Sequence, residues 1–388
     1  MSRVIISDTI KYVGANDYEI DLFESQYIVP NGVSYNSYII LDEKIAVMDT
    51  VDWRATDEWF TNVEKVLDGK IPEYLVISHL EPDHASNIAN FVAKYPDVKL
   101  VGNAKTFAML PQFFELEIKD GQKVVVAEGD KLSLGEHTLQ FFMAPMVHWP
   151  EVMVTYEEKE KILFSADGFG KFGALDVEED WACEARRYYF NIVGKYGQPV
   201  QNLLKKATTL DIQMICPLHG PVLKENLGYY IGLYDTWSKY EPENEGIFIA
   251  YASIHGNTKK VAEKFAEMLK EAGAPKVSIA DLSRDDMAEA IEDAFRYDRL
   301  VLAAPTYDGG LFPAMDDFLH HLASKSYQKR TVGLIENGSW GPMAAKKMRE
   351  QLEVMKDITI LEPVVTIKST LKDENIESLK QLMNELLK

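Results

Sequence analysis

Four side chains of metal-binding type fall within six residues in the run His79-Leu-Glu-Pro-Asp-His84. Imidazole nitrogens and carboxylate oxygens together suit iron, zinc and similar metals. Apolar residues 74–78 come just before the run and read as a strand, so the run begins at a strand end. Asp83 could instead only cap a following helix. The density of ligand-type residues favours a metal-binding loop, with His79, Glu81, Asp83 and His84 as candidate ligands.

Three more residues of ligand type end apolar runs in the same half of the chain. His148 lies within residues 145–150 and His219 within residues 216–220, both beside Pro, Trp or Gly. Such loop positions suit ligands better than core packing. Asp167 precedes Gly168, where an acid could bind a metal or only begin a turn. His137, in a polar turn, is expected at the surface.

Composition limits the kind of metal site and the kind of partner. The chain has 388 residues, two of them Cys with no C-x-x-C pair, which excludes a disulfide framework, a zinc ribbon, a rubredoxin-type iron site and a four-Cys iron–sulfur cluster. Any metal would therefore take nitrogen and oxygen ligands. The formal net charge of −20 repels phosphate backbones and anionic bilayers, so neither nucleic acid nor membrane is an expected partner.

The N-terminal stretch has no basic segment followed by an apolar run and a small-residue cleavage site, so no signal peptide is expected. No segment approaches the roughly 18 apolar residues of a membrane span. A cytoplasmic location is the expectation.

A different kind of loop follows apolar residues 247–252 in the second half. Its hydroxyl and amide groups, at the start of a predicted helix, could converge on a phosphate. The loop has neither the G-x-G-x-x-G pattern nor the lysine of a P-loop, which favours a bound monophosphate cofactor over a nucleotide undergoing transfer. An ordinary helix cap is the alternative. The candidate residues are Ser253, Ile254, His255, Gly256, Asn257 and Thr258.

Two further loops end the next strand-like runs of this half. Each offers an aromatic residue among flexible turn residues, and Tyr307 and Trp340 could border a planar ring or pack against their own sheet. Because turn residues surround both aromatic residues, a role in bordering a planar ligand ring is the favoured interpretation. The candidates are Pro305, Thr306, Tyr307, Asp308 and Gly309 in one loop and Asn337, Gly338, Ser339, Trp340 and Gly341 in the other.

These loops must be positioned by two α/β domains. In the first half, short strands alternate with helices, and residues 153–165 read as a hairpin; a helical stretch covers about residues 181–207. Residues 240–246 contain Pro, Gly and three acids and are the candidate linker. Beyond them five strands, the last at residues 358–367, alternate with five helices, which predicts a doubly wound parallel sheet. The predicted domains are residues 1–245 and 246–388.

The metal residues of the first half resemble those of the metallo-β-lactamase fold, an αββα sandwich. Hydrolases of that fold usually have His where this chain has Glu81, and a carboxylate shifts the preference from zinc toward iron. The resemblance implies one metal on His79, Glu81 and His148 and a second on Asp83, His84 and His219. Asp167 would bridge the two metals.

The three loops of the second half resemble those of flavodoxins, which bind FMN. Over the whole chain, the order of the halves resembles the flavodiiron proteins, or rubredoxin:oxygen oxidoreductases. That resemblance implies an oxidoreductase in which FMN passes electrons to a diiron centre that reduces dioxygen to water, nitric oxide to nitrous oxide, or both.

The family also implies partners and further site residues. The electron donor would be a separate protein, most often rubredoxin, or reduced deazaflavin. A head-to-tail homodimer, or a dimer of such dimers, would place one subunit's FMN beside the other's metals. Tyr196 and Trp149 could shape the substrate pocket as catalytic residues or could simply pack. Ser25 stands in a region where some members carry His.

Three other functions fit parts of the sequence. A hydrolase could use the same two-metal scaffold through a metal-bound hydroxide, but Glu81 and the flavodoxin-like half count against it. A pure electron carrier would leave seven ligand-type residues unexplained. An interaction protein would account only for the acidic surface, which solubility explains as well.

Overall fold

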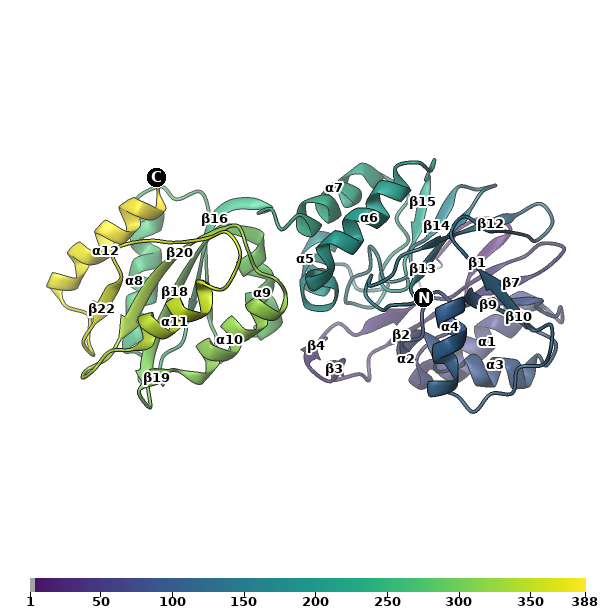
Figure 1. The fold of residues 1–388 in the computed structure, drawn as a ribbon, viewed down its shortest axis with the longest axis horizontal. Coiled ribbons are helices and arrows are strands. Elements are labelled where there is room, and N and C mark those ends of the chain that lie inside the picture. The colour runs from purple at the N-terminus through teal and green to yellow at the C-terminus, as the bar shows by residue number, and fades with distance from the viewer. Residues whose placement is uncertain (1–3) are drawn as a thin grey trace. The chain divides into compact units, whose positions relative to one another are not determined.

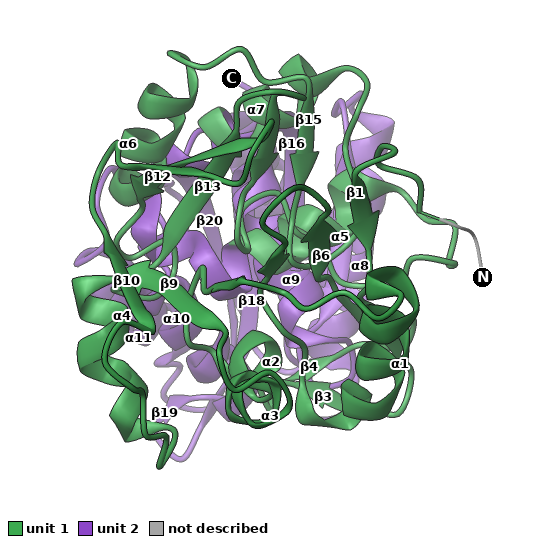
Figure 2. Ribbon diagram, turned by 90° about the vertical axis from the view of Figure 1, so that its right-hand side faces the viewer, with its two compact units in different colours: residues 1–189, 198–235 green, residues 190–197, 236–388 purple. Residues whose placement is uncertain are grey.

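The computed structural model describes residues 4–388; residues 1–3, part of the stretch in which no signal peptide is expected, lie outside the described residues. The chain divides into two compact units, residues 1–189 with 198–235 and residues 190–197 with 236–388 (Figure 2). Along the chain, the main division falls between residues 235 and 236, about ten residues before the predicted boundary between residues 245 and 246. The predicted boundary stays a prediction. Within residues 4–388, no helix has the length and apolar character needed to span a bilayer.

The first unit contains two large sheets, with strand orders β1-β6-β7-β8-β9-β10 and β11-β12-β13-β14-β15. Side chains from both sheets, among them Ile40, Val76, Phe141 and Phe164, share one buried core. The strands are β1 (Ile10–Tyr12), β6 (Tyr38–Ile40), β7 (Ala46–Met48), β8 (Tyr74–Val76), β9 (Lys99–Asn103), β10 (Lys123–Val126), β11 (Lys131–Ser133), β12 (Thr138–Met143), β13 (Met153–Glu157), β14 (Ile162–Phe164) and β15 (Met214–Cys216).

Helices cover this pair of sheets from both outer sides (Figure 1). On one side are α1 (Thr56–Leu67), α2 (Pro82–Ala85), α3 (Ile88–Lys94) and α4 (Ala104–Met109). In α1 the buried residues Trp59, Val63 and Leu67 recur every four positions, so one stripe of the helix faces the sheet. The predicted αββα sandwich is confirmed.

Several predicted details of this unit differ from the structure. The helical stretch of residues 181–207 is α5 (Trp181–Tyr188), a π-helical turn (Tyr189–Val193), a 3₁₀ turn (Gly194–Tyr196) and α6 (Gly197–Ala207). The helix α7 (Leu227–Ser238) follows. Two small pairs of strands, β2 (Ala15–Asp17) with β5 (Val33–Tyr35) and β3 (Leu22–Phe23) with β4 (Tyr27–Ile28), were not predicted because they are too short for a periodic pattern.

The second unit is the predicted doubly wound sheet. Its main strands, in the order β17-β16-β18-β20-β21, are all parallel, and β22 also pairs in parallel with β20. The predicted single strand over residues 358–367 is two strands, because Pro363 lies between them and has no N–H to donate. The strands are β16 (Asn244–Tyr251), β17 (Val277–Asp281), β18 (Tyr297–Tyr307), β19 (Gly310–Leu311), β20 (Arg330–Asn337), β21 (Ile358–Ile360) and β22 (Val365–Ile367).

Five helices pack on this sheet (Figure 1). Buried Val261, Phe265 and Leu269 of the first helix join Val301 and Ile335 of the strands in one core. As the chain is wound, β16, β18 and β20 carry their following loops at the same edge, where doubly wound sheets bind ligands. The helices are α8 (Asn257–Glu271), α9 (Met287–Arg296), α10 (Pro313–Ser324), α11 (Ala344–Leu352) and α12 (Asp373–Leu386).

Candidate metal centre and cofactor pocket

The predicted metal loop begins where β8 ends and continues into α2. Glu81 is the N-cap residue of this short helix and makes no capping hydrogen bond with its side chain. Asp83 lies inside the helix, and neither of its buried oxygens has a hydrogen-bond partner among residues 4–388. Asp83 is therefore not the helix cap of the alternative interpretation.

One group of four ligand-type residues, the first ligand group, is formed by His79, Glu81, His148 and Asp167; their ligand atoms all lie within 4.8 Å of one another. The Nε2 atom of His148 lies 2.9 Å from Glu81 Oε2 and 2.9 Å from Asp167 Oδ2. The Nε2 atom of His79 lies 3.2 Å from the same Asp167 oxygen and 3.5 Å from Glu81 Oε2. Two imidazoles and two carboxylates thus converge on one point.

Asp83, His84 and His219 form the second ligand group. Asp83 Oδ2 lies 3.3 Å from His84 Nε2 and 3.1 Å from His219 Nε2, and the two Nε2 atoms are 3.0 Å apart. Asp167 Oδ1 lies 3.7 Å from His84 Nε2 and 3.9 Å from His219 Nε2. One oxygen of Asp167 therefore faces each group.

The donor atoms of both groups fit metal ions. Six of them are buried and lack a hydrogen-bond partner among the described residues: both ring nitrogens of His79, both oxygens of Asp83, Nδ1 of His84 and Oδ1 of Asp167. Each buried polar atom without a hydrogen-bond partner costs about 1–3 kcal/mol. Six such atoms in one cluster are therefore best explained by metal ions that they bind. The Nε2 atoms of His84 and His219 lie 3.0 Å apart, close enough for both to bind one metal ion as lone-pair donors.

The electrostatics of the metal-free cluster show which groups hold protons. Burial lowers the pKa of His148, but hydrogen bonds to Asp167 and Glu81 outweigh it and raise the pKa to about 10. Burial, with the charge of Glu81, raises the pKa of Asp83 to about 6. Burial and the neighbouring His219 hold the pKa of His84 well below its usual value. Protons must therefore leave the cluster before all its nitrogens and oxygens can bind metal.

Alternating residues from β5 to β6, at positions 34, 36 and 38, hold the His219 loop. Ser34 O accepts a hydrogen bond from His219 Nδ1 at 2.8 Å, which leaves Nε2 free to bind a metal. The Asn36 amide donates to Pro217 O and Gly220 O, both at 2.8 Å, and the Tyr38 hydroxyl (Oη) donates to Pro217 O at 2.6 Å. These residues were not predicted, since nothing local marks a partner about 180 residues away.

The structure gives the surroundings of the other residues that were named from the sequence. The ring of Trp149 packs against Phe113, with 6.0 Å between centroids. Tyr196 lies in the segment 190–197, which clusters with the second unit. Ser25, at the turn between β3 and β4, has φ 57°. Catalytic roles for Trp149 and Tyr196 stay predictions.

The rings that contact the cluster histidines belong to residues missed from the sequence, Phe23, Tyr35 and Tyr188. All three are buried. Their aromatic character alone gives no signal, because most aromatic residues pack in cores.

The surface position expected for His137 is wrong. This residue is 1% exposed and its ring contacts Glu157 Oε1 at 2.9 Å and Thr9 Oγ1 at 3.0 Å. The turn is polar in sequence, but these partners from β13 and the N-terminal segment let it be buried at low cost.

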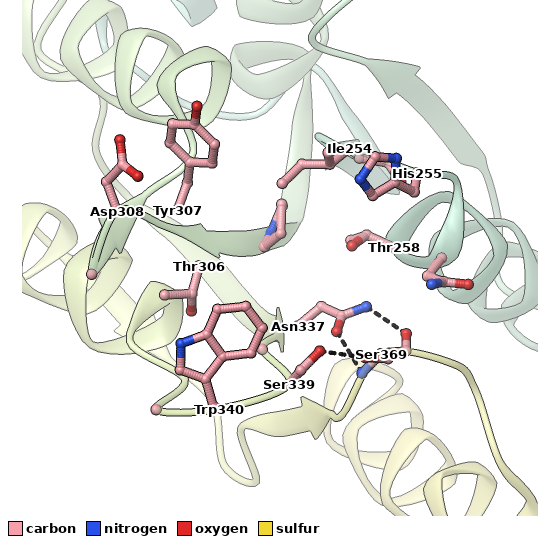
Figure 3. Close-up of a pocket in the computed structure, with 16 residues that line it drawn as sticks. Ile254, His255, Thr258, Thr306, Tyr307, Asp308, Asn337, Ser339, Trp340 and Ser369 are labelled. Atoms are coloured by element: carbon pink, nitrogen blue, oxygen red, sulfur yellow. Dashed lines mark hydrogen bonds between the residues drawn. The ribbon is translucent and has the colours of Figure 1, made fainter.

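The three predicted loops of the second unit line a cavity of about 630 Å³. Figure 3 shows Tyr307 and Trp340 toward one end of it and His255 and Thr258 toward the other. Every predicted cofactor-binding residue lines the cavity except Gly256, which is the N-cap residue of α8 with φ 86°. Trp340 is 86% exposed, so it does not pack against its own sheet.

Ser369, which follows β22, also lines the cavity and was not predicted. Its backbone N–H donates to Asn337 Oδ1 at 3.0 Å, and its carbonyl accepts from Asn337 Nδ2 at 2.9 Å (Figure 3). The predicted strand ended at residue 367, and nothing in the sequence placed the following turn beside the Asn337 loop.

Comparisons with known proteins match both halves of the chain. Residues 33–220 match the ODP family of beta lactamases, and residues 248–369 match a flavodoxin domain. A nitric oxide reductase of Moorella thermoacetica is 29% identical over 98% of this chain and 96% of its own length. An anaerobic nitric oxide reductase flavorubredoxin of Aliivibrio fischeri is 27% identical over 89% of this chain and 72% of its own.

A solved structure covers the same two units. The rubredoxin oxygen:oxidoreductase of Desulfovibrio gigas superposes with a TM-score of 0.91 at 26% sequence identity, over 98% of this chain and 97% of that one.

Proposed function

Because the chain belongs to the flavodiiron proteins, we propose that it is an oxidoreductase that reduces dioxygen to water, nitric oxide to nitrous oxide, or both. The observation that carries this proposal is the carboxylate of Asp167, whose two oxygens face two ligand groups, in a chain that also has a flavodoxin-type pocket. Two iron ions and one FMN are the cofactors that these sites fit.

The residues of each ligand group give the two metals different surroundings. His79, Glu81 and His148 would hold one iron, and Asp83, His84 and His219 the other, with Asp167 between them. When bound, FMN and the iron pair supply the electrons that reduction of dioxygen or nitric oxide requires. Glu81, in place of a third imidazole, adds a negative charge that favours iron over zinc.

The protein's own groups fix the histidines for this task. The carbonyl of Ser34 holds the N–H of His219 Nδ1, and the hydroxyl of Thr50 donates to the carbonyl of His84 at 2.6 Å. The rings of Phe23, Tyr35 and Tyr188 pack against histidines of the second ligand group and would exclude water from it. In the second unit, the Thr258 hydroxyl at the start of α8 suits the FMN phosphate, and Tyr307 and Trp340 suit its ring.

The partners are also part of the proposal. Electrons would come from a separate donor, rubredoxin or reduced deazaflavin, since two Cys cannot form a rubredoxin-type site within the chain. The protein would act in the cytoplasm as a head-to-tail homodimer or a dimer of dimers. Trp149 and Tyr196 would border the substrate pocket.

The first test is the cofactor content of the purified protein. We expect about two irons and one FMN per chain; zinc without flavin would contradict the proposal and favour a hydrolase. The fully reduced protein is then mixed with dioxygen or with nitric oxide while its flavin absorbance is followed. Reoxidation by neither gas would rule out the proposed activity.

A further inference from the structure

Two buried carboxylates that belong to neither ligand group bind the residues before and after His79. The backbone N–H of Ser78 donates to Asp49 Oδ1 at 2.7 Å, and the Ser78 hydroxyl donates to Asp49 Oδ2 at 2.7 Å. On the other side, the backbone N–H of Leu80 donates to Glu151 Oε1 at 2.9 Å. The residues before and after a metal ligand are thus each held by an acid from a distant part of the chain.

Both acids lack a charged partner. Asp49 is 2% exposed and Glu151 is 1% exposed, and among residues 4–388 neither has a Lys, Arg or His nitrogen within ion-pair distance. Glu151 Oε2 has no hydrogen-bond partner in the described part of the chain. Burial raises the pKa of Asp49 to about 6, although the hydrogen bonds from Ser78 and the charge of His79 act in the opposite direction.

Buried, unpaired carboxylates are costly, so some other feature must account for two of them at one place. Hydrogen bonds to backbone N–H groups alone do not require a charge, since a neutral amide oxygen accepts them equally well. The ligand cluster adjoins both acids, since His79 lies between Ser78 and Leu80, and Asp49 interacts electrostatically with His79 and Asp167. A bound metal pair would be the largest local charge and would stabilise both acids in ionised form.

We propose that Asp49 and Glu151 are positioning residues for the metal centre, which fix the backbone around His79 and add their negative charges to those of the ligands. This inference rests on the proposed function. Glu81, Asp83 and Asp167 offset only part of the charge of two ferric ions, and the outer acids offset more of it. Their charge therefore stabilises the oxidised metal pair and lowers its reduction potential.

The chain offers neutral variants of nearly unchanged shape. Asp49→Asn keeps an oxygen for Ser78 N–H and gives the Ser78 hydroxyl a donor, and Glu151→Gln keeps an oxygen for Leu80 N–H. Glu157→Gln is the matched control, since Glu157 is also fully buried in the first unit but contacts His137 and not a ligand-group residue. Melting temperatures are measured first, to show that each variant is folded.

The test measures the midpoint potential of the iron centre and the rate at which a chelator removes iron. In Asp49→Asn and Glu151→Gln we expect a higher midpoint potential and metal affinity weaker by about tenfold, with both effects larger in the double variant. Glu157→Gln should match the wild type. FMN content is expected to stay at the wild-type value in every variant.

Two results would overturn the inference. One is a midpoint potential equal to that of the wild type in both single variants, which would show that the two acids only hold the backbone and do not affect the charge of the metal centre. The other is an equal shift in Glu157→Gln, which would make the effect general to buried acids. Absence of iron from the wild-type protein would instead contradict the proposed function, so the two failures are distinguishable.

Discussion

At the scale of residues, the position of Asp167 gives the metal centre its two-part character. Its Oδ2 atom approaches both histidines of the first ligand group, and its Oδ1 atom approaches both histidines of the second. Of the three carboxylates in the two groups, Glu81 lies near histidines of the first group and Asp83 near histidines of the second, so only Asp167 lies within 4 Å of histidines of both. Neutralising it should therefore affect both metals together.

We expect Asp167→Asn to reduce iron from about two per chain to one or fewer, because a neutral amide loses the bridging charge and one of two oxygen ligands. FMN content should not change. Iron and flavin are measured on the same sample, and Asp57→Asn, an exposed position in α1, serves as the control. Full iron occupancy in Asp167→Asn would contradict the bridging role.

The protonation of His148 leads to a pH dependence. Its pKa in the metal-free protein is raised to about 10, so the ring holds a proton at pH 7 that metal binding must displace. Metal affinity should thus rise with pH up to about that value and fall as the solution is acidified. The effect of pH on folding stability has the opposite direction. Because the pKa of His148 rises from 6.5 to about 10 on folding, the protonated ring stabilises the metal-free fold. This contribution is complete below pH 6.5 and is lost above about pH 10.

Calorimetry of metal binding in two buffers with different heats of ionisation measures this proton release. We expect at least one proton released per metal-loaded chain at pH 7. Zero release, with an affinity independent of pH, would show that His148 is already neutral in the metal-free protein.

At the scale of elements, hydrogen bonds hold both ends of the loop that carries Trp340. Gly338 N–H donates to Ile367 O at 2.9 Å and Asn337 pairs with the backbone of Ser369. At the other end, Thr306 Oγ1 accepts from Met343 N at 2.8 Å and Ala344 N at 3.1 Å. The loop therefore presents an exposed indole from a rigid frame (Figure 3).

We expect Trp340→Ala to weaken FMN binding by about fivefold, which corresponds to about 1 kcal/mol for one lost ring contact. The metal content should stay the same. Titration of the flavin-free protein, followed by flavin fluorescence, gives the affinity, and Trp53→Ala provides a control at an exposed Trp of the first unit. Equal affinity in Trp340→Ala and the wild type would place the ring of the flavin elsewhere.

At the scale of the whole molecule, each cofactor site is built within one unit. Both ligand groups come from residues 79–219, and the cavity is lined only by residues 253–369. Each unit also has its own hydrophobic core. The two sites should therefore respond separately when one cofactor is removed.

Removing the metal should destabilise only the first unit. If metal is present at about a thousand times its dissociation constant, binding contributes roughly 4 kcal/mol, or a melting shift of about 10 °C. The shift is followed by circular dichroism, while flavin fluorescence reports release of FMN from the second unit. Loss of FMN at the same lowered temperature would show that the units unfold together.

The types of ligand and the order of the two folds could be predicted from the amino-acid sequence alone. Dense ligand-type residues at strand ends and turn residues after successive strands are local features, and they predicted the seven metal-type residues and all three cavity loops. Only the tertiary structure decided which partners support them. Ser34, Asn36, Glu151 and Ser369 act across long separations in sequence, where hydrogen bonds and burial depend on sheet packing rather than on local pattern.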